Sequence, residues 1–129
     1  MKFFFNSSQN AEALKAKDFL IKEYNQHNLD EADVIVPIGG DGFLLKNLHD
    51  YSKHNLPFFG LNYGSIGFLM NSQSNENLIQ RIKKSQDTVL KPLEMTAKDK
   101  DDKIYSSIAY NEVSLMRQSH QAAKINIII

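Results

Sequence analysis

Four consecutive residues, Gly39-Gly40-Asp41-Gly42, combine the conformational freedom of glycine with a carboxylate that can take part in chemistry. They lie between an unbroken apolar run, residues 34–38, and a helical pattern that begins at Phe43. Backbone N–H groups at such a strand-to-helix turn attract anions, and glycine lets the backbone approach a phosphate without a Cβ clash. A carboxylate would repel a phosphate, so Asp41 is better suited to act as a general base toward a hydroxyl, or to contact Mg²⁺ through water. Lys46, one turn further on, lies where it can reach a phosphate.

The same tetrapeptide is also compatible with a simple turn in which Asp41 only caps a helix. It is not a Walker loop, because the Gly-Lys-Ser/Thr ending is absent, and it lacks the Gly-x-Gly-x-x-Gly pattern of dinucleotide-binding folds. The four histidines are scattered without metal-ligand spacing, so we expect each to be exposed or hydrogen-bonded and predict no metal-ligating residues. The absence of cysteine excludes disulfides, thiolate zinc sites and a cysteine nucleophile. From the residues alone, a catalytic loop and a structural turn both stay open.

Length and composition are those of an ordinary globular chain. The 129 residues are 42% apolar and 23% charged, so the chain as a whole is expected to fold around a core. Basic and acidic residues number 15 each, so the net charge does not indicate binding to nucleic acid or to a membrane surface. No apolar run approaches the roughly 20 residues of a membrane helix. We therefore expect a soluble, cytoplasmic protein with neither a nucleic-acid nor a membrane partner.

The elements that must position the loop alternate along the chain. We predict strands over residues 2–5, 34–38 and 57–61, and helices over residues 11–24, 43–51 and 77–83. Asn10 is the expected cap of the first helix, and Ser74 or Asn75 that of the last. Pro37 has no N–H to donate to a ladder and is expected near the end of its strand. This alternation is typical of a doubly wound α/β layer, in which ligands bind at the carboxyl ends of parallel strands.

The pattern becomes β-rich after Pro92. Strands are expected over residues 94–97 and 103–108 around a charged turn, and over residues 109–116 and 122–129. The change predicts an α/β domain over residues 1–91, followed by the start of an incomplete β-rich domain over residues 92–129. The last three residues, all isoleucine, would be an aggregation-prone edge if exposed. We therefore expect the chain to be the front part of a longer protein, or to pair this strand with a partner.

Three segments of the chain resemble a known family. Residues 34–45, Val-Ile-Val-Pro-Ile-Gly-Gly-Asp-Gly-Phe-Leu-Leu, are similar to the signature of NAD kinases. Residues 60–69, Gly-Leu-Asn-Tyr-Gly-Ser-Ile-Gly-Phe-Leu, resemble the second block of that family, and residues 110–115, Tyr-Asn-Glu-Val-Ser-Leu, resemble its Asn-Glu block. The order and spacing of these three segments resemble those of the bacterial branch of the family. The family's later Gly-Asp-Gly stretch and its serine- and threonine-rich block do not occur in these 129 residues.

The resemblance implies a Rossmann-like α/β domain followed by the first strands of a β-rich, β-sandwich-like domain. It implies transfer of a phosphoryl group from ATP, or from polyphosphate, to the 2′-hydroxyl of the adenosine ribose of NAD, which gives NADP with the help of Mg²⁺. Asp41 matches the family's proton acceptor for that hydroxyl. The other matching positions are nucleotide contacts: Gly39, Gly40, Gly42, Lys46, Phe68, Asn111 and Glu112.

These contacts match different parts of NAD in the family. Phe68 matches an aromatic residue beside the adenine, whereas Asn111 and Glu112 match a pair on the ribose or nicotinamide side. Asn62 and Gly64 match the same loop as Phe68, but we interpret them as turn residues. Two alternatives stay open: a non-catalytic nucleotide-binding module or inactive fragment of the kinase, and a related kinase that acts on a lipid or sugar phosphate. The family also implies a homodimer or homotetramer of the full-length protein.

Overall fold

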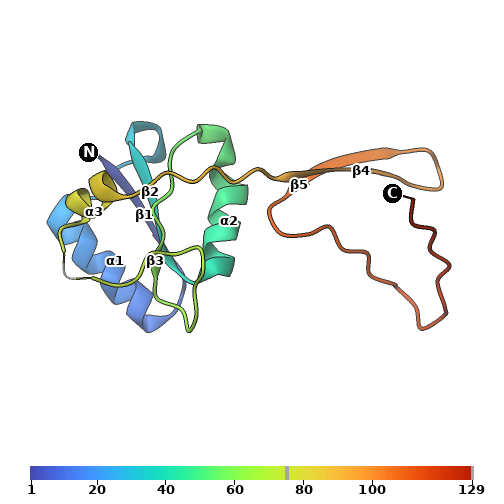
Figure 1. Cartoon of the computed structure of the whole chain (residues 1–129), viewed down its shortest axis with the longest axis horizontal. Helices are drawn as coiled ribbons and strands as arrows, with labels where there is room; N and C mark the ends of the chain where they lie inside the picture. Colours follow the sequence, from blue (N-terminus) through green and yellow to red (C-terminus); the bar gives the residue numbers. More distant parts are fainter. Residues whose placement is uncertain (75, 129) are drawn as a thin grey trace. The chain divides into compact units, whose positions relative to one another are not determined.

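The computed structural model describes residues 1–74 and 76–128, and it divides the chain into two compact units. The first unit comprises residues 1–89 and the second residues 90–129. Helices and a parallel sheet make up the first unit, and an antiparallel hairpin belongs to the second (Figure 1). Within the described part of the chain, no helix is both long and apolar enough to cross a lipid bilayer.

The first unit is a three-stranded parallel sheet in the order β1-β2-β3, with helices between the strands. Its strands are β1 (Phe3–Ser7), β2 (Val34–Gly39) and β3 (Leu61–Asn62), and its helices are α1 (Ala11–Tyr24), α2 (Asp41–Tyr51) and α3 (Leu78–Lys84). Two short 3₁₀ turns, η1 (Leu29–Glu31) and η2 (Ser52–His54), follow α1 and α2. The predicted α/β class with parallel strands is confirmed.

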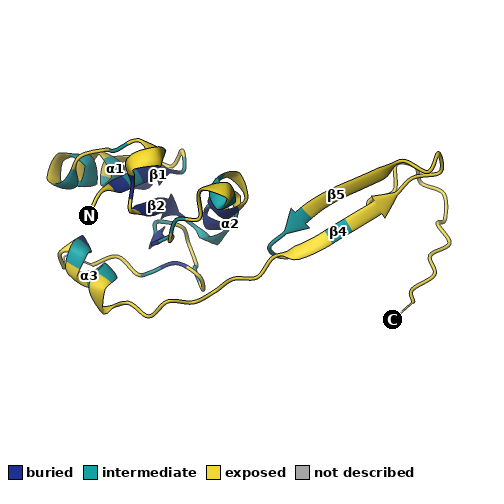
Figure 2. Cartoon of the chain, turned by 90° about the horizontal axis from the view of Figure 1, so that it is seen from above, coloured by how far each residue is buried: buried dark blue, intermediate teal, exposed yellow. Residues whose placement is uncertain are grey.

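The sheet is covered on both faces. On one face, the three strands, the segment before β3 and the helices α1 and α3 contribute to one cluster of buried residues: Phe3, Phe5, Ala13, Val34, Val36, Ile38, Phe59, Leu61 and Leu78. On the other face the Phe4 ring meets Tyr51 of α2, with ring centroids 5.5 Å apart. Figure 2 shows the buried residues gathered in this unit. A strand buried on both faces requires an unbroken apolar sequence, which is what β2 has.

Local side-chain caps set where the helices begin. Asn10 caps α1, because its Oδ1 accepts a hydrogen bond from Ala13 N at 2.7 Å, and the predicted cap and bounds of this helix are confirmed. The predicted cap of α3 is wrong: Asn77 caps that helix, with Oδ1 accepting from Ile79 N and Gln80 N. Ser74 instead accepts from Glu76 N in a local turn, and Asn75 lies outside the described residues.

The third strand is shorter than predicted, and Pro37 explains the difference. The run predicted over residues 57–61 forms an isolated bridge between Phe58 and Ile35, and the regular ladder resumes only at Leu61, opposite Ile38. Pro37 lies between these two pairings on the central strand, and it has no N–H to donate. The missing donor therefore interrupts the ladder between the bridge and β3.

The second unit contains a single described hairpin, β4 (Leu93–Lys98) paired with β5 (Ile104–Ala109). Its tip is a tight turn in which Asp99 Oδ1 accepts from Asp101 N and Lys103 N, and Asp102 adopts a left-handed φ of 63°. The further strands predicted over residues 109–116 and 122–129 are wrong for the residues described up to 128, and Ile129 lies outside them. Beyond Ala109, which ends β5, no described residue of either run is in a strand, and a strand without a neighbour leaves its backbone groups unpaired.

Candidate functional site

The sheet and α2 together present Asp41 at the carboxyl edge of the sheet. β2 ends at Gly39, Gly40 is the N-cap of α2, and Asp41 is the first residue of that helix, two residues earlier than predicted. Gly40 O accepts from Phe43 N at 2.9 Å and from Leu44 N at 3.1 Å, which closes the first turn directly behind the loop. The Asp41 carboxylate therefore lies at the positive end of the helix dipole, where a negative charge is stabilised.

The Asp41 carboxylate binds the backbone of the second motif. Its Oδ2 accepts a hydrogen bond from Phe68 N at 2.8 Å, and its Oδ1 accepts one from Leu69 N at 3.2 Å. The two motifs, 27 residues apart in sequence, thus meet at one side chain. This contact could not be predicted from the sequence, because the donors are backbone N–H groups that every residue except proline carries.

Glycines allow this close approach of two backbone segments. A Cβ added to Gly64 would lie 2.9 Å from Gly40 Cα. A side chain at position 64 would therefore prevent the close contact between these two glycines. A Cβ on Gly67 would lie 2.8 Å from Asn62 Nδ2 and 3.2 Å from Asp41 Oδ1. Asn62 Oδ1 also accepts from Gly64 N at 2.9 Å, which fixes the turn at the start of the loop. By contrast, nothing lies within 4 Å of a Cβ placed on Gly42.

Lys46 follows on the exposed side of α2. Its ammonium pairs with the Asp50 carboxylate one turn further along the helix. Hydrogen bonding to Asp50, aided by the attraction of its charge, raises the pKa of Lys46 above its usual value. The cation is therefore already paired, and a phosphate near the loop would have to compete with Asp50 for it.

The remaining predicted residues are exposed. The side chain of Phe68 is 91% exposed, although its backbone N–H is bonded to Asp41. Asn111 and Glu112 follow β5 in the second unit and are exposed there. The structure thus brings together the Gly39–Gly42 loop and the Gly64–Leu69 segment within the first unit, with Lys46 on the same helix as Asp41.

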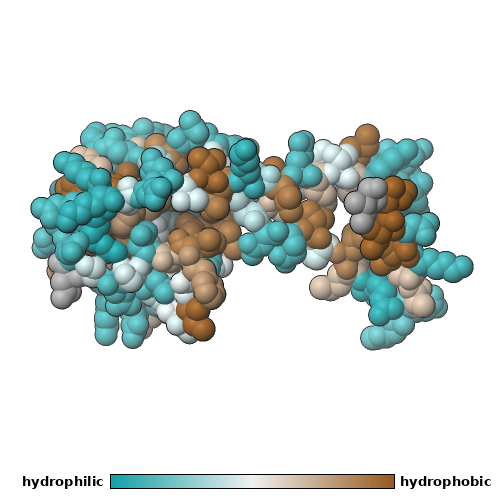
Figure 3. All heavy atoms as spheres, viewed as in Figure 1, coloured by the Kyte–Doolittle hydropathy of each residue, from teal (hydrophilic) through white to brown (hydrophobic). Residues whose placement is uncertain are grey.

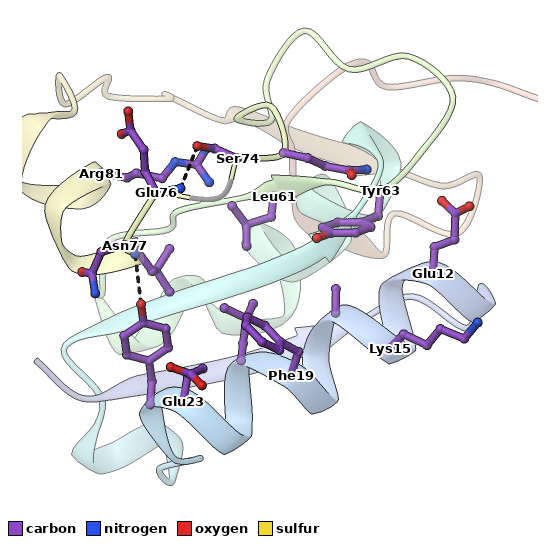
Figure 4. Close-up of a pocket in the computed structure, with 15 residues that line it drawn as sticks. Glu12, Lys15, Phe19, Glu23, Leu61, Tyr63, Ser74, Glu76, Asn77 and Arg81 are labelled. Atoms are coloured by element: carbon purple, nitrogen blue, oxygen red, sulfur yellow. Dashed lines mark hydrogen bonds between the residues drawn. The ribbon is translucent and has the colours of Figure 1, made fainter.

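A groove of about 790 Å³ lies between α1 and the segment that leads into α3. Figure 4 shows Phe19 of α1 beside this groove, with Leu61 and Tyr63 across from it. Phe19 is 62% exposed. None of the residues predicted to contact the nucleotide lines this groove, although Leu61 and Tyr63 belong to the second motif, residues 60–69. The groove could not be predicted from the sequence, because its lining comes from three separate segments, residues 12–24, 61–63 and 73–81, that only the fold brings together.

The described residues contain no ready-made metal centre. Among them, no group of three or more His, Cys, Asp or Glu side chains could hold a metal ion. The expectation that every histidine is exposed or hydrogen-bonded is wrong for His27, whose Nδ1 is buried without a hydrogen-bond partner. The backbone of His27 is bound to the start of β1, where its N–H donates to Phe3 O at 3.0 Å.

Comparison with known proteins places these features in a family. Residues 2–90 match the model of the ATP-NAD kinase N-terminal domain. A protein from Rickettsia canadensis, named NAD kinase, is 52% identical over 106 residues, which are 82% of this chain and 42% of the relative. The NAD kinase of Rickettsia felis is 46% identical over 120 residues, which are 93% of this chain and 47% of the relative. The chain thus spans less than half the length of these relatives.

A solved structure is also similar to this chain. It is an NAD kinase from Archaeoglobus fulgidus in complex with ATP, 28% identical, with a TM-score of 0.41. The match covers 65% of this chain and 36% of that one. The family model alone covers more than half of the chain, from the start of β1 to the end of the first unit. The chain therefore belongs to the NAD kinase family, of which its residues 2–90 form the N-terminal domain.

Proposed function

We propose that this chain is the N-terminal part of an NAD kinase, which phosphorylates the 2′-hydroxyl of the adenosine ribose of NAD to give NADP. ATP, or polyphosphate, is the proposed phosphoryl donor. The observation that carries the proposal is the position of Asp41 at the carboxyl edge of the parallel sheet, in the first turn of α2, in a chain of this family. A carboxylate at that position has the chemistry of a general base for a hydroxyl group.

In the proposed reaction Asp41 accepts the hydrogen bond of the 2′-hydroxyl and takes its proton as the new O–P bond forms. The bond between the transferred phosphorus and the leaving oxygen breaks in the same step, and the rest of the donor leaves with the electron pair. Most of the acceleration of such a transfer comes from positioning and charge neutralisation rather than from covalent chemistry. We propose that Gly39, Gly40 and Gly42 admit the nucleotide close to the backbone, and that Lys46 exchanges Asp50 for a phosphate.

The reaction would also use a divalent cation, proposed to be Mg²⁺. Magnesium prefers oxygen ligands, keeps several waters, and is commonly held by one or two carboxylates together with substrate phosphates. At the candidate site, Asp41 is the carboxylate that could contact such a cation through water. When bound, the cation would supply charge neutralisation on the phosphates.

The remaining assignments extend the same proposal. Phe68, with its exposed ring, is proposed to contact the adenine, and Asn111 and Glu112 the ribose or nicotinamide side of NAD. We further propose that residues 1–91 form the Rossmann-like domain and residues 92–129 the start of a β-rich NAD-binding domain. The full-length protein is proposed to be a cytoplasmic, bacterial homodimer or homotetramer with neither a nucleic-acid nor a membrane partner.

The test is an assay in which glucose-6-phosphate dehydrogenase reports NADP formed from NAD, ATP and Mg²⁺. It is run on this chain and on a version extended through the remaining length of its relatives. Activity in the extended protein supports the proposal, and activity in both would locate a sufficient site in this chain. A folded extended protein without activity, but with measurable NAD or ATP binding, would replace the kinase with a nucleotide-binding module.

Substitution of the base sharpens this test. Asp41→Asn in the active form is expected to lower kcat by about 10²-fold or more, since general-base catalysis contributes roughly this much. Asp18→Asn is the matched control, because Asp18 undergoes the same chemical change on the exposed surface of α1. Equal activity of Asp41→Asn and the control would remove Asp41 from its proposed role, whatever the substrate.

A further inference from the structure

The segment that carries Phe68 is a closed loop. Its two ends meet beside β3, where Asn71 N donates to Gly60 O at 2.9 Å and Asn62 N donates to Asn71 O at 2.8 Å. Beneath this closure Met70 is buried against Gly60. The base of the loop is therefore tied to the sheet by backbone hydrogen bonds and by packing, in the manner of a compact Ω-loop.

The tip of the loop has a different support. Residues 64–66, 68 and 69 are exposed, so the tip lacks the apolar burial that orders the base. At the tip, the amides of Phe68 and Leu69 donate to the two oxygens of the Asp41 carboxylate. Hydrogen bonds from N–H groups to an ionised carboxylate are stronger than those between neutral groups. The fit is also close, because a Cβ on Gly67 would lie 3.2 Å from Asp41 Oδ1.

We propose that Asp41 and the Gly64–Leu69 segment position each other. The carboxylate anchors the tip of the loop, and with it the place where the exposed Phe68 ring is presented. In return, the two amides hold the carboxylate in one orientation. This mutual anchor is a role of Asp41 distinct from proton transfer, and it rests on contacts within this chain rather than on the proposed function.

The anchor leaves the carboxylate able to bind a ligand. Each carboxylate oxygen offers about two lone-pair sites, and each amide uses one of them. Asp41 thus retains an acceptor site on each oxygen while it holds the loop. A hydroxyl that approaches Asp41 meets an acceptor whose orientation is already set, beside a loop whose aromatic residue is already placed. Preorganisation of this kind lowers the cost of ordering a site when a ligand binds.

The experiment measures the two amides directly in the ¹⁵N- and ¹³C-labelled chain of 129 residues, without nucleotide. Hydrogen exchange of the Phe68 and Leu69 amides is compared in the unsubstituted chain, in Asp41→Ala and in Asp41→Asn. Asp50→Ala is the matched control, because it removes a carboxylate from the same helix away from the loop. Exchange at Ile35 in β2 reports whether the fold is retained.

In Asp41→Ala we expect both amides to exchange about tenfold faster, in proportion to the loss of a hydrogen bond to a charged group. Asp41→Asn keeps one acceptor oxygen, so one of the two amides is expected to stay protected. The Asn71 amide at the base of the loop, and all amides in the control, are expected to change less than about twofold, since their hydrogen bonds remain. If Asp41→Ala does not fold, exchange of the Phe68 and Leu69 amides in Asp41→Asn decides whether the carboxylate anchors the loop.

A second variant tests the reverse direction, in which the loop orients the carboxylate. Gly67→Ala leaves Asp41 unchanged but introduces a Cβ 2.8 Å from Asn62 Nδ2 and 3.2 Å from Asp41 Oδ1. We expect it to weaken the scalar coupling through the hydrogen bond between Phe68 N and the Asp41 carboxyl carbon. Unchanged exchange at both amides in folded Asp41 variants, or an unchanged coupling in Gly67→Ala, would overturn mutual anchoring.

Discussion

Both units of this chain contain paired β-strands, yet they bury them very differently. Every residue of β2, Val34–Gly39, is buried, because helices cover both faces of the parallel sheet. In the hairpin of the second unit, β4 and β5 pair regularly, yet no residue of either is fully buried. Hydrophobic side chains of this unit, such as those of Ile104, Ile127 and Ile128, remain exposed, and Figure 3 shows hydrophobic residues at the surface there.

This difference in burial shows that strands can pair without being stabilised by a core. An antiparallel hairpin needs only a short turn, so β4 and β5 can pair from local sequence alone. A parallel strand needs a crossover, and here the crossovers are the helices that also cover the sheet. An isolated two-stranded hairpin is at best marginally stable in water. We therefore expect the stability of this chain to lie in its first unit.

The largest expected effect comes from a cavity in the first unit. Phe5 in β1 is 1% exposed and contacts the Phe3 ring, with centroids 5.4 Å apart. Phe5→Ala should lower the free energy of unfolding by about 3–5 kcal/mol, from lost burial and from the cavity left behind. Urea unfolding followed by far-ultraviolet circular dichroism measures this change.

The matched substitution in the second unit is Ile104→Ala. Ile104 begins β5 and is 64% exposed, so its truncation should change the free energy of unfolding by less than about 0.5 kcal/mol. A cost for Ile104→Ala comparable with that of Phe5→Ala would contradict the comparison, because it would mean that the hairpin buries Ile104 in solution.

A smaller effect distinguishes two glycines of the candidate site. Gly64→Ala places a Cβ 2.9 Å from Gly40 Cα, so the two backbone segments must separate, at a cost of about 1–3 kcal/mol. Gly42→Ala meets no atom within 4 Å and lies in the first turn of α2 without a positive φ. It should therefore stabilise the fold by about 0.4–1 kcal/mol. Thermal unfolding of the two variants side by side measures both effects.

The Gly42→Ala variant also separates stability from the proposed function. If Gly42 contacts a nucleotide, this variant should bind NAD or ATP more weakly although it unfolds at a higher temperature. A Gly64→Ala variant as stable as the unsubstituted chain would contradict the close contact of the two motifs. It would also weaken the distinction between a tightly packed first unit and a loosely packed second one.

The parts of the fold that could be predicted depend on local chemistry. The bounds of α1 followed from the Asn10 cap and from helix-forming residues within one segment. The shortened third strand could not be predicted in the same way, since it depends on Pro37 in a neighbouring strand. The strands expected after β5 failed for a related reason, because β-forming residues specify a strand only where a neighbour pairs with it.

The same distinction between local and long-range features applies to the candidate site. Asp41 could be identified because the Gly39–Gly42 motif is contiguous and directly follows a buried run. The hydrogen bonds from Phe68 and Leu69 to Asp41 could not be predicted, since backbone amide donors do not depend on the type of side chain. Backbone contacts between distant segments become visible only when the fold has placed both segments.

The smallest expected effect concerns a feature that both units share, an exposed Lys–Asp pair four residues apart. Lys46 pairs with Asp50 in α2, and Lys98 pairs with Asp102 at the tip of the hairpin. Asp50 raises the pKa of Lys46 above the usual value of a lysine through a hydrogen bond and charge attraction. The pair's contribution to stability is therefore fully present below the usual lysine pKa and is lost as the pH rises through the raised pKa of Lys46. Asp50→Asn should move the Lys46 titration, followed by NMR of its side chain, toward lower pH, whereas Asp102→Asn should leave it unchanged. A Lys46 midpoint that does not respond to Asp50→Asn would mean that the pair is not formed in solution, and Lys46 would then be free to meet a phosphate without competition.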